Sequence, residues 1–300
     1  AWDEERVQSR HTNQMKSEPA AFLEFAERVP GWCVILGLIG DGQQIHGGEE
    51  GGMQLWVDAV QNTQETWVVA ASDYLAPSLS ESGMQCDGYP ELHLKESVRF
   101  NFAAGLSSWV SGVVDNDLPV DRLRSIAQKL RDGGYQLRIT RNLKAAKLFL
   151  WDKYEDSPDA RFGLLKSSRD KALTKLGIHE VGGRFFRAGP WYADPEESPN
   201  SCRRLLDAAT EFGSQGLELD HCLVVWGTDF LRNEDGWSIE SAKRYMKSSG
   251  VKDAEMLRRN AYRVLLTRGR EGCLICLPDS LRELDETYDY LVKSGCEELT

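Results

Sequence analysis

The chain contains the stretch Cys33-Val34-Ile35-Leu36-Gly37-Leu38-Ile39 followed by Gly40-Asp41-Gly42-Gln43-Gln44, and this stretch decides the fold. A short, continuous apolar run predicts a strand buried on both faces, which is typical of a parallel sheet covered by helices. In such sheets, ligands bind where the strands end. We therefore expect Asp41 and Gln44 to lie at a sheet edge as phosphate-sensing groups, although a Gly-rich turn after a strand can also be no more than a turn.

Three later segments add to this pattern. Leu94 to Arg99 has the sequence L-K-E-S-V-R. Thr210 to Asp220 has the sequence T-E-F-G-S-Q-G-L-E-L-D and precedes a second apolar run at 222–227. Tyr262 to Arg270 has the sequence Y-R-V-L-L-T-R-G-R. Taken along the chain, the four segments resemble, in order, motifs III, IV, V and VI of superfamily 1 helicases and translocases.

The wording of the last two segments resembles one bacterial group in more detail. On the patterns A-T-E-F-x-x-Q-G-L-E-L-D and R-V-L-L-T-R-G, the chain is identified as a member of the Schlafen group 3-like DNA/RNA helicase domain family. The resemblance implies an α/β chain with the RecA-like P-loop NTPase fold, in which parallel sheets are flanked by helices. It also implies ATP and Mg²⁺ as cofactors and single-stranded DNA or RNA as the partner.

The resemblance assigns roles to individual residues. Gln44 would report the γ-phosphate, and Arg268 would be an arginine finger that acts from the second lobe. The residues implied to take part in catalysis are Gln44, Arg99 and Arg268. The residues implied to bind ATP are Asp41, Gly216, Glu218 and Arg268. The residues implied to contact nucleic acid are Lys166, Ser167, Ser168, Arg169 and Thr210.

The position of Arg268 also follows from helical spacing. If residues 253–268 form a helix, Leu257 and Arg268 are separated by about three turns at ~3.6 residues per turn. Arg268 then lies on the apolar side with Leu257, Ala261 and Val264 and points inward. A buried guanidinium needs an anionic partner, as a finger beside a phosphate would have.

Other interpretations of these residues stay open. Arg268 could pair with a buried carboxylate, Glu218 could cap a local turn, and Arg99 could be a surface residue at a strand end. Val98 stands where many motif IV sequences have Tyr, and Phe212 stands where motif V usually has His. The second substitution puts strand separation in doubt more than ATP binding.

Two expected elements do not occur in the sequence. There is no G-x-x-x-x-G-K-[ST] pattern, whose amides and Lys would hold the β- and γ-phosphates. There is also no apolar strand ending in Asp-Glu before Gly40, where the family holds Mg²⁺. Because the family has a string ending in Ala-Trp at this point, the start at Ala1-Trp2 predicts a fragment that begins just after that strand. We expect the fragment to be inactive by itself.

Composition favours an α/β protein of the cytoplasm. The 300 residues are 41% hydrophobic and 28% charged, and no run approaches the roughly 18 apolar residues of a membrane span. The net charge of -11 counts against tight nucleic-acid binding, which depends on Lys and Arg. Cys273 and Cys276 form a C-x-x-C, but strand alternation would point the thiols to opposite faces, so core packing is favoured over a metal site.

The periodicity of the chain predicts two lobes. The Ser, Gly and Pro content places a linker at 76–90, between the C-terminal part of a first RecA-like lobe at 1–75 and a second lobe at 91–300. In the second lobe, helical spacing at 123–130 and 143–154 alternates with strands at 136–141 and 161–168. Strands that alternate with helices predict a parallel sheet.

Three functions are compatible with these features. The leading hypothesis is the C-terminal part of an ATP-dependent DNA or RNA helicase or translocase. The second is an NTP-driven conformational switch that does not unwind nucleic acid. The third is a degenerate RecA-like interaction module, against which the presence of Gln44, Glu218 and Arg268 argues.

Overall fold

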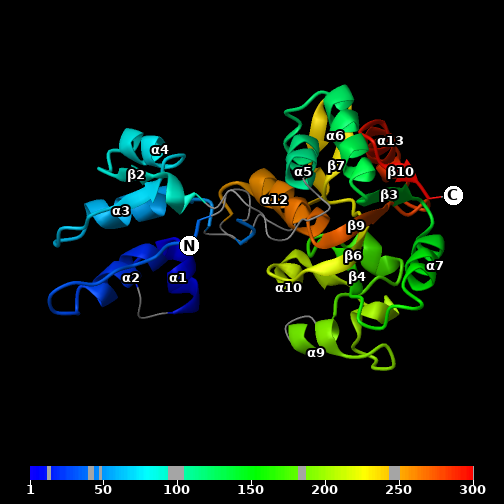
Figure 1. Ribbon diagram of the computed structural model, residues 1–300, viewed down its shortest axis with the longest axis horizontal. Coiled ribbons are helices and arrows are strands. Elements are labelled where there is room, and N and C mark those ends of the chain that lie inside the picture. The colour runs from blue at the N-terminus through cyan, green and yellow to red at the C-terminus, as the bar shows by residue number, and fades with distance from the viewer. Residues whose placement is uncertain are drawn as a thin grey trace. The chain divides into compact units, whose positions relative to one another are not determined.

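The chain forms two compact units in the computed structural model (Figure 1). The structure describes residues 1–11, 15–39, 44–46, 49–93, 105–181, 187–242 and 251–299. The first unit comprises Ala1–Ser97 with Ser248–Asp253, and the second comprises Val98–Lys247 with Ala254–Thr300.

The second unit is built on a six-stranded parallel sheet in the order β10-β3-β9-β6-β4-β5. The strands are β3 (Gln136–Thr140), β4 (Phe162–Lys166), β5 (Ala209–Thr210), β6 (Leu219–Val225), β9 (Gly269–Cys276) and β10 (Glu297–Glu298). The central strand β6 is buried along its whole length, as expected for a strand covered on both faces. The predicted α/β class, with parallel strands flanked by helices, is confirmed.

Helices cover both faces of this sheet. They are α5 (Leu106–Asp115), α6 (Val120–Asp132), α7 (Leu143–Lys153), α8 (Ala172–Lys175), α9 (Ala188–Ala193), α10 (Glu211–Ser214), α12 (Ala254–Leu266) and α13 (Asp285–Lys293), with 3-10 turns at Cys202–Arg204 and Arg282–Leu284. Side chains of α5, α6, α12 and α13 share one core with Cys222 and Cys273. Side chains of α7 and α8 share the other core with Leu223 and Cys276. The thiols of the C-x-x-C therefore fill opposite cores, as strand alternation predicts.

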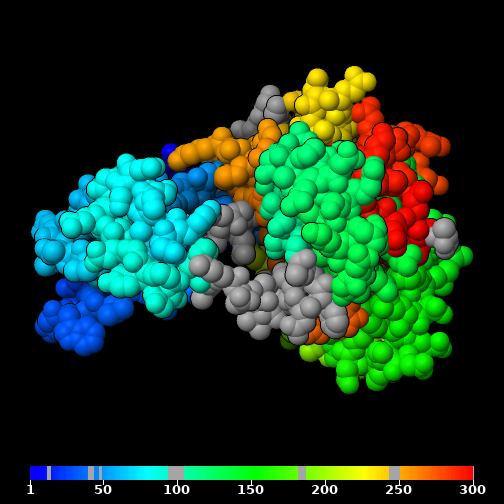
Figure 2. Space-filling view, turned by 45° about the horizontal axis from the view of Figure 1, so that its top comes forward, coloured from blue at the N-terminus to red at the C-terminus, as the bar shows by residue number. Residues whose placement is uncertain are grey.

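A hairpin and a contact near the C-terminus lie outside the main sheet of this unit. A short antiparallel hairpin, β7 (Leu231–Asn233) with β8 (Gly236–Ser238), follows the loop after β6. Figure 2 shows α5 and α6 against the C-terminal segment, where Arg124 Nε donates to the carbonyl oxygen of Lys293 at 3.3 Å. Within the part of the chain that the structure describes, no helix is long and apolar enough to cross a membrane.

The first unit is less regular. Its elements are α1 (Glu4–Arg10), α2 (Glu18–Ala26), α3 (Gln54–Gln61), β1 (Ala70–Ser72), α4 (Ala76–Glu81), β2 (Asp87–Tyr89) and the 3-10 turn Pro90–Leu92. Strands β1 and β2 pair in parallel as a sheet of their own. The segment 76–90, which the sequence predicts to be a linker, contains α4 and β2. The division between the units falls later, after Ser97.

The apolar run Cys33–Ile39 differs from its prediction as a doubly buried strand. It has no strand assignment, and 78% of Val34, 78% of Leu36 and 80% of Leu38 are exposed. A strand is stable only when neighbouring strands satisfy its backbone groups and cover its faces. Among the residues described, none forms a strand paired with this run. The local pattern is therefore that of an inner strand, but no strand in the described part of the chain covers it.

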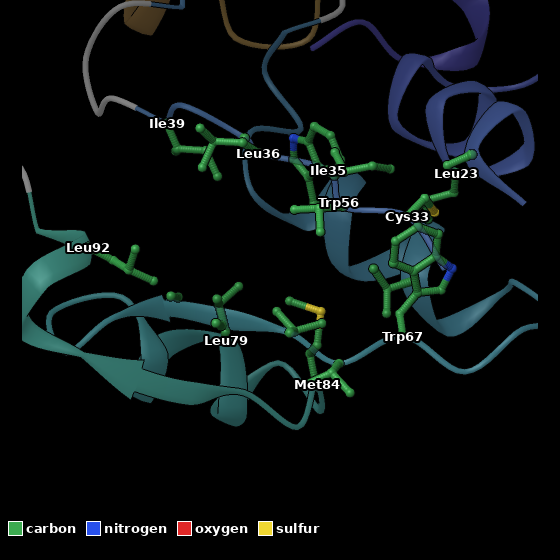
Figure 3. Close-up of a pocket in the computed structure, with 18 of the residues that line it drawn as sticks. Leu23, Cys33, Ile35, Leu36, Ile39, Trp56, Trp67, Leu79, Met84 and Leu92 are labelled. Atoms are coloured by element: carbon green, nitrogen blue, oxygen red, sulfur yellow. The ribbon is translucent and has the colours of Figure 1, made fainter. Parts of the chain in front are cut away.

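The same run borders a large apolar cavity in the first unit. The cavity has a volume of about 1130 Å³. Figure 3 shows Leu23, Cys33 and Ile35 on one side and Leu79 and Met84 on the other. Apolar side chains make up most of the walls, and Glu27, Glu65 and His93 are among the polar residues that also line the cavity.

Candidate functional site at the two edges of the sheet

Polar side chains gather where β4, β5 and β6 end. Ser167 and Ser168 follow β4, Glu211 follows β5, and Asp229 lies in the loop after β6. Because these strands are parallel neighbours, their carboxyl ends meet at one edge of the sheet. We call this the carboxyl edge. Ser167, Glu211 and Asp229 are buried there, with exposed fractions of 1% or less.

Arg258 of α12 joins the three strand ends. Its Nη1 donates to Ser167 Oγ at 2.7 Å and to Asp229 Oδ2 at 3.2 Å, and its Nη2 donates to Glu211 Oε1 at 3.1 Å. Glu211 also accepts from the backbone N–H and the hydroxyl of Ser168, at 2.9 and 2.7 Å. Ser167 Oγ donates to Asp229 Oδ2. A guanidinium between two carboxylates with added hydroxyl donors is a buried ion cluster with matched charges. Within the part of the chain that the structure describes, Arg258 Nε is buried without a hydrogen-bond partner.

The surrounding hydrogen bonds fix this cluster. Tyr262 Oη donates to Asp229 Oδ1 at 2.7 Å and accepts from the N–H of Gly227 at 3.0 Å. Burial raises the pKa of Asp229, against the opposing effects of the Arg258 charge and of hydrogen bonds from Ser167 and Tyr262. Burial alone would lower the pKa of Arg258, but the charges of Glu211 and Asp229 raise it overall. The arginine therefore stays protonated in its enclosed position.

The structure brings together the residues predicted to contact nucleic acid, since Lys166 and Thr210 are register partners. Their side chains are not equally accessible. Lys166 is fully buried, and its Nζ lies 3.3 Å from Thr174 Oγ1 and 3.6 Å from Glu180 Oε1. Ser167 is buried inside the cluster, whereas Ser168, Arg169 and Thr210 are partly exposed. A phosphate at this edge would meet those last three residues first.

Three of the four residues predicted to bind ATP, Gly216, Glu218 and Arg268, lie at the opposite, amino edge of the sheet. Gly216 and Glu218 precede β6, and Arg268 precedes β9. The N–H of Leu219 donates to the carbonyl oxygen of Arg268 at 2.8 Å, so the two segments are side by side. Gly216 is exposed with φ +87°, and a Cβ there would meet nothing within 4 Å. This leaves an accessible backbone edge beside Arg268.

Arg268 is buried, as its spacing from Leu257 predicts, although α12 ends at Leu266 rather than at Arg268. Its Nε donates to the carbonyl oxygen of Val264 at 2.9 Å, and its Nη1 donates to that of Leu217 at 3.2 Å. Its Nη2 donates to Thr267 Oγ1 at 3.1 Å. Hydrogen bonds from a guanidinium to phosphate are stronger than those to neutral carbonyls, so an anion would compete for these donors.

Two of the predicted residues cannot be compared with the others. Asp41 and Arg99 fall outside the residues that the structure describes. Gln44 is described and lies partly buried in the first unit. Among the described side chains, no group of three or more His, Cys, Asp or Glu residues is arranged to hold a metal ion.

Sequence reasoning missed the centre of the carboxyl edge, which consists of Glu211, Asp229 and Arg258. A signal for Glu211 was present, because it is an acid between a strand and an apolar residue inside the motif V-like segment. Arg258 lies ten residues before Arg268 in the same helix-forming segment, but its neighbour Arg259 has the same chemistry. Only the fold distinguishes the two, since Arg258 is enclosed and the side chain of Arg259 is 30% exposed.

Comparison with known proteins identifies the family. The family described as "Schlafen group 3, DNA/RNA helicase domain" matches residues 1–279. The chain therefore belongs to this family, and the family resemblance inferred from its motifs is confirmed. No curated protein sequence matches the chain.

Proposed function

Because the chain belongs to a helicase-domain family, we propose that it is part of an ATP-dependent DNA or RNA helicase or translocase with two RecA-like lobes. The second unit would be the complete second lobe. The first unit would be part of the first lobe, whose phosphate-binding loop and Mg²⁺ ligands would come from outside this sequence. The observation that carries the proposal is the placement of Arg268, Gly216 and Glu218 together at one edge of the parallel sheet.

The residues at the amino edge fit an anionic ligand. Gly216 leaves the backbone open, and Arg268 supplies several donors from a buried position that holds its side chain in place. Phosphoryl transfer needs positive charge around the transferring group, and an arginine from a second lobe makes that charge conditional on lobe closure. When ATP and Mg²⁺ are bound, they supply the transferring phosphoryl group and its charge neutralisation. Arg268 would then exchange its carbonyl acceptors for phosphate oxygens.

The carboxyl edge would contact the nucleic-acid strand. Ser168, Arg169 and Thr210 are partly exposed there, so a backbone phosphate could accept from their hydroxyl and guanidinium groups. Such contacts position a strand without reading its sequence. We therefore expect little sequence preference, and weak affinity because the chain carries a net charge of -11.

The test is ATP hydrolysis by the longer protein that includes the phosphate-binding loop. Hydrolysis that a single-stranded oligonucleotide accelerates would support a helicase or translocase. Separation of a duplex with a single-stranded overhang would then distinguish a helicase from a translocase. A longer protein that does not hydrolyse ATP would contradict the proposal.

The burial of Lys166 and Ser167 favours a second candidate. Both side chains point into the protein and have internal partners, which reduces the polar surface available to a nucleic-acid strand. An NTP-driven switch would use the amino edge in the same way but would not need the carboxyl edge for binding. Hydrolysis at the same rate with and without DNA and RNA would support the switch.

A further inference from the structure

Helix α12 joins the two edges of the sheet. Arg258 lies in its first half, and Thr267-Arg268 follow its C-terminal end. From Arg258 to Leu266 the helix advances by about 12 Å at ~1.5 Å per residue. The helix packs against β6 and α10, so it runs along the face of the sheet from the carboxyl edge to the amino edge. If the helix moves as a rigid body, a shift of its end at the carboxyl edge also shifts its end at the amino edge.

At the carboxyl edge, the helix is tied to the loop that follows β4. Arg258 Nη1 contacts Ser167 directly, and its Nη2 contacts Ser168 through Glu211, which accepts from both residues. Arg258 and Glu211 are buried, so breaking the contact between them would leave a buried charge without one of its partners. Removing one member of a buried ion pair is strongly destabilising. The loop and the helix are therefore expected to move together.

The hydroxyl of Ser168 connects the contacts between the loop and the helix to the protein surface. It donates to Glu211 Oε1 at 2.7 Å, yet the residue is partly exposed. A phosphate oxygen that accepts from this hydroxyl would remove one of the donors of Glu211. The carboxylate would then depend more on Arg258, and the position of the guanidinium would respond.

We propose that Arg258 is a positioning residue that couples occupation of the Ser167–Ser168 loop by a nucleic-acid strand to the placement of Arg268. The inference rests on the proposed function, because that function assigns a ligand to each edge. Arg258 itself contacts neither ligand. It would make the rate of ATP hydrolysis depend on whether a strand is bound.

The test is the ratio of ATP hydrolysis rates with and without a single-stranded DNA or RNA oligonucleotide, measured on the longer protein. This ratio does not depend on the folded fraction, because both rates scale with it. In Arg258→Lys, which keeps the charge but loses the fork of donors, the ratio should fall by about 5-fold or more, the size of a typical coupling. Arg259→Lys is the matched control, since its pairs with Glu255 and Asp115 lie away from the strand ends.

The outcomes separate the two proposals. A parent protein without strand-stimulated hydrolysis would overturn the proposed function and this inference with it. A stimulated parent whose ratio is unchanged in Arg258→Lys would overturn the inference alone. Equal losses in Arg258→Lys and Arg259→Lys would also overturn it, because they would show a general effect of altering α12.

Ser168→Ala provides a second variant, in which Arg258 keeps its contacts to Ser167, Glu211 and Asp229 and Glu211 loses one neutral donor. It removes the hydroxyl that joins the surface to Glu211, and it should lower the same ratio while Arg258 keeps its partners. In the 300-residue chain, amide hydrogen exchange should change at the C-terminal end of α12 when the oligonucleotide is added. Exchange that changes only in the β4 loop would overturn the inference.

Discussion

The two edges of the parallel sheet hold their arginines differently. At the carboxyl edge, Arg258 is enclosed with Glu211 and Asp229, and all three side chains are nearly or fully buried. At the amino edge, Arg268 is also buried, but Gly216 beside it is exposed and Glu218 is partly exposed. The first arrangement is a closed cluster, whereas the second borders an accessible backbone.

This difference shows how two arginines of the same chemistry, one within α12 and one just after its C-terminal end, can have different roles. A guanidinium between two carboxylates already has its charge matched, so it is suited to holding elements together. A guanidinium beside an open backbone edge can meet an incoming anion. The distinction lies in the environment and not in the residue type.

The largest effect is expected at the amino edge. In the longer protein, Arg268→Lys should reduce ATP hydrolysis by roughly 10³-fold or more, the size of an arginine-finger effect, while nucleotide affinity changes little. Lys keeps the charge but cannot grip two phosphate oxygens at once. Steady-state hydrolysis and nucleotide titration measure the two quantities. A variant that hydrolyses ATP at the parental rate but melts at a lower temperature would show that Arg268 is only a structural residue.

A second effect, on stability, is expected at the carboxyl edge. Arg258→Met keeps most of the side-chain volume but leaves two buried carboxylates without their cation, so the free energy of unfolding should fall by about 3–5 kcal/mol. Arg259→Met is the control, and its partly exposed ion pairs predict a loss below about 1 kcal/mol. Denaturant unfolding of the 300-residue chain measures both. Equal losses would show that the cluster is no more stabilising than a surface pair.

A third effect concerns acid and the middle of the sheet, between the two edges. Burial, together with the charges of Lys153 and Arg138, lowers the pKa of His221 from 6.5 to about 3. The unfolded chain therefore binds a proton that the folded chain excludes, and stability should fall as the pH drops below about 6.5. The loss is at most about 1.4 kcal/mol per pH unit.

The comparison of His221→Phe with the parent isolates this contribution. The ring of His221 lies edge-on to Phe149 and Tyr154, so an aromatic replacement keeps the shape of the site. The pH dependence of the variant should be shallower between pH 6.5 and 4. Parallel curves for the two proteins would show that His221 is protonated in the folded state or does not matter.

Much of the second unit can be predicted from sequence because its signals are local. Alternation at Gln136–Thr140 and the apolar run after Asp220 indicate β3 and β6, since each pattern reflects the faces that the strand buries. The helical spacing of Leu123, Ala127 and Leu130 likewise indicates α6. These elements bury their apolar residues against one another within the same unit.

The remaining features depend on contacts that local patterns do not specify. Cys33–Ile39 has the pattern of an inner strand, but burial also requires neighbouring strands. Lys166 has a charged side chain of the kind that contacts phosphate, but this side chain points inward to Thr174 and Glu180. The contacts of the ion cluster join residues that are 29 to 91 positions apart, such as Arg258 with Asp229 at 29 positions and with Ser167 at 91. Spacing along the chain cannot reveal such pairs.

The smallest effect tests which side chains at the carboxyl edge face a bound strand. For single strands, each neutralised phosphate adds about 0.7 to the slope of log affinity against log salt concentration. Arg169→Met should lower this slope by about that amount, because the residue is partly exposed at the edge. Lys166→Met should leave the slope unchanged, because its ammonium is buried beside Glu180. The slope is the right measurement, since a drop in affinity alone would also follow from damage to the fold. A slope that falls equally in both variants would show that Lys166 turns outward to the strand, and the difference in accessibility along this edge would then disappear on binding.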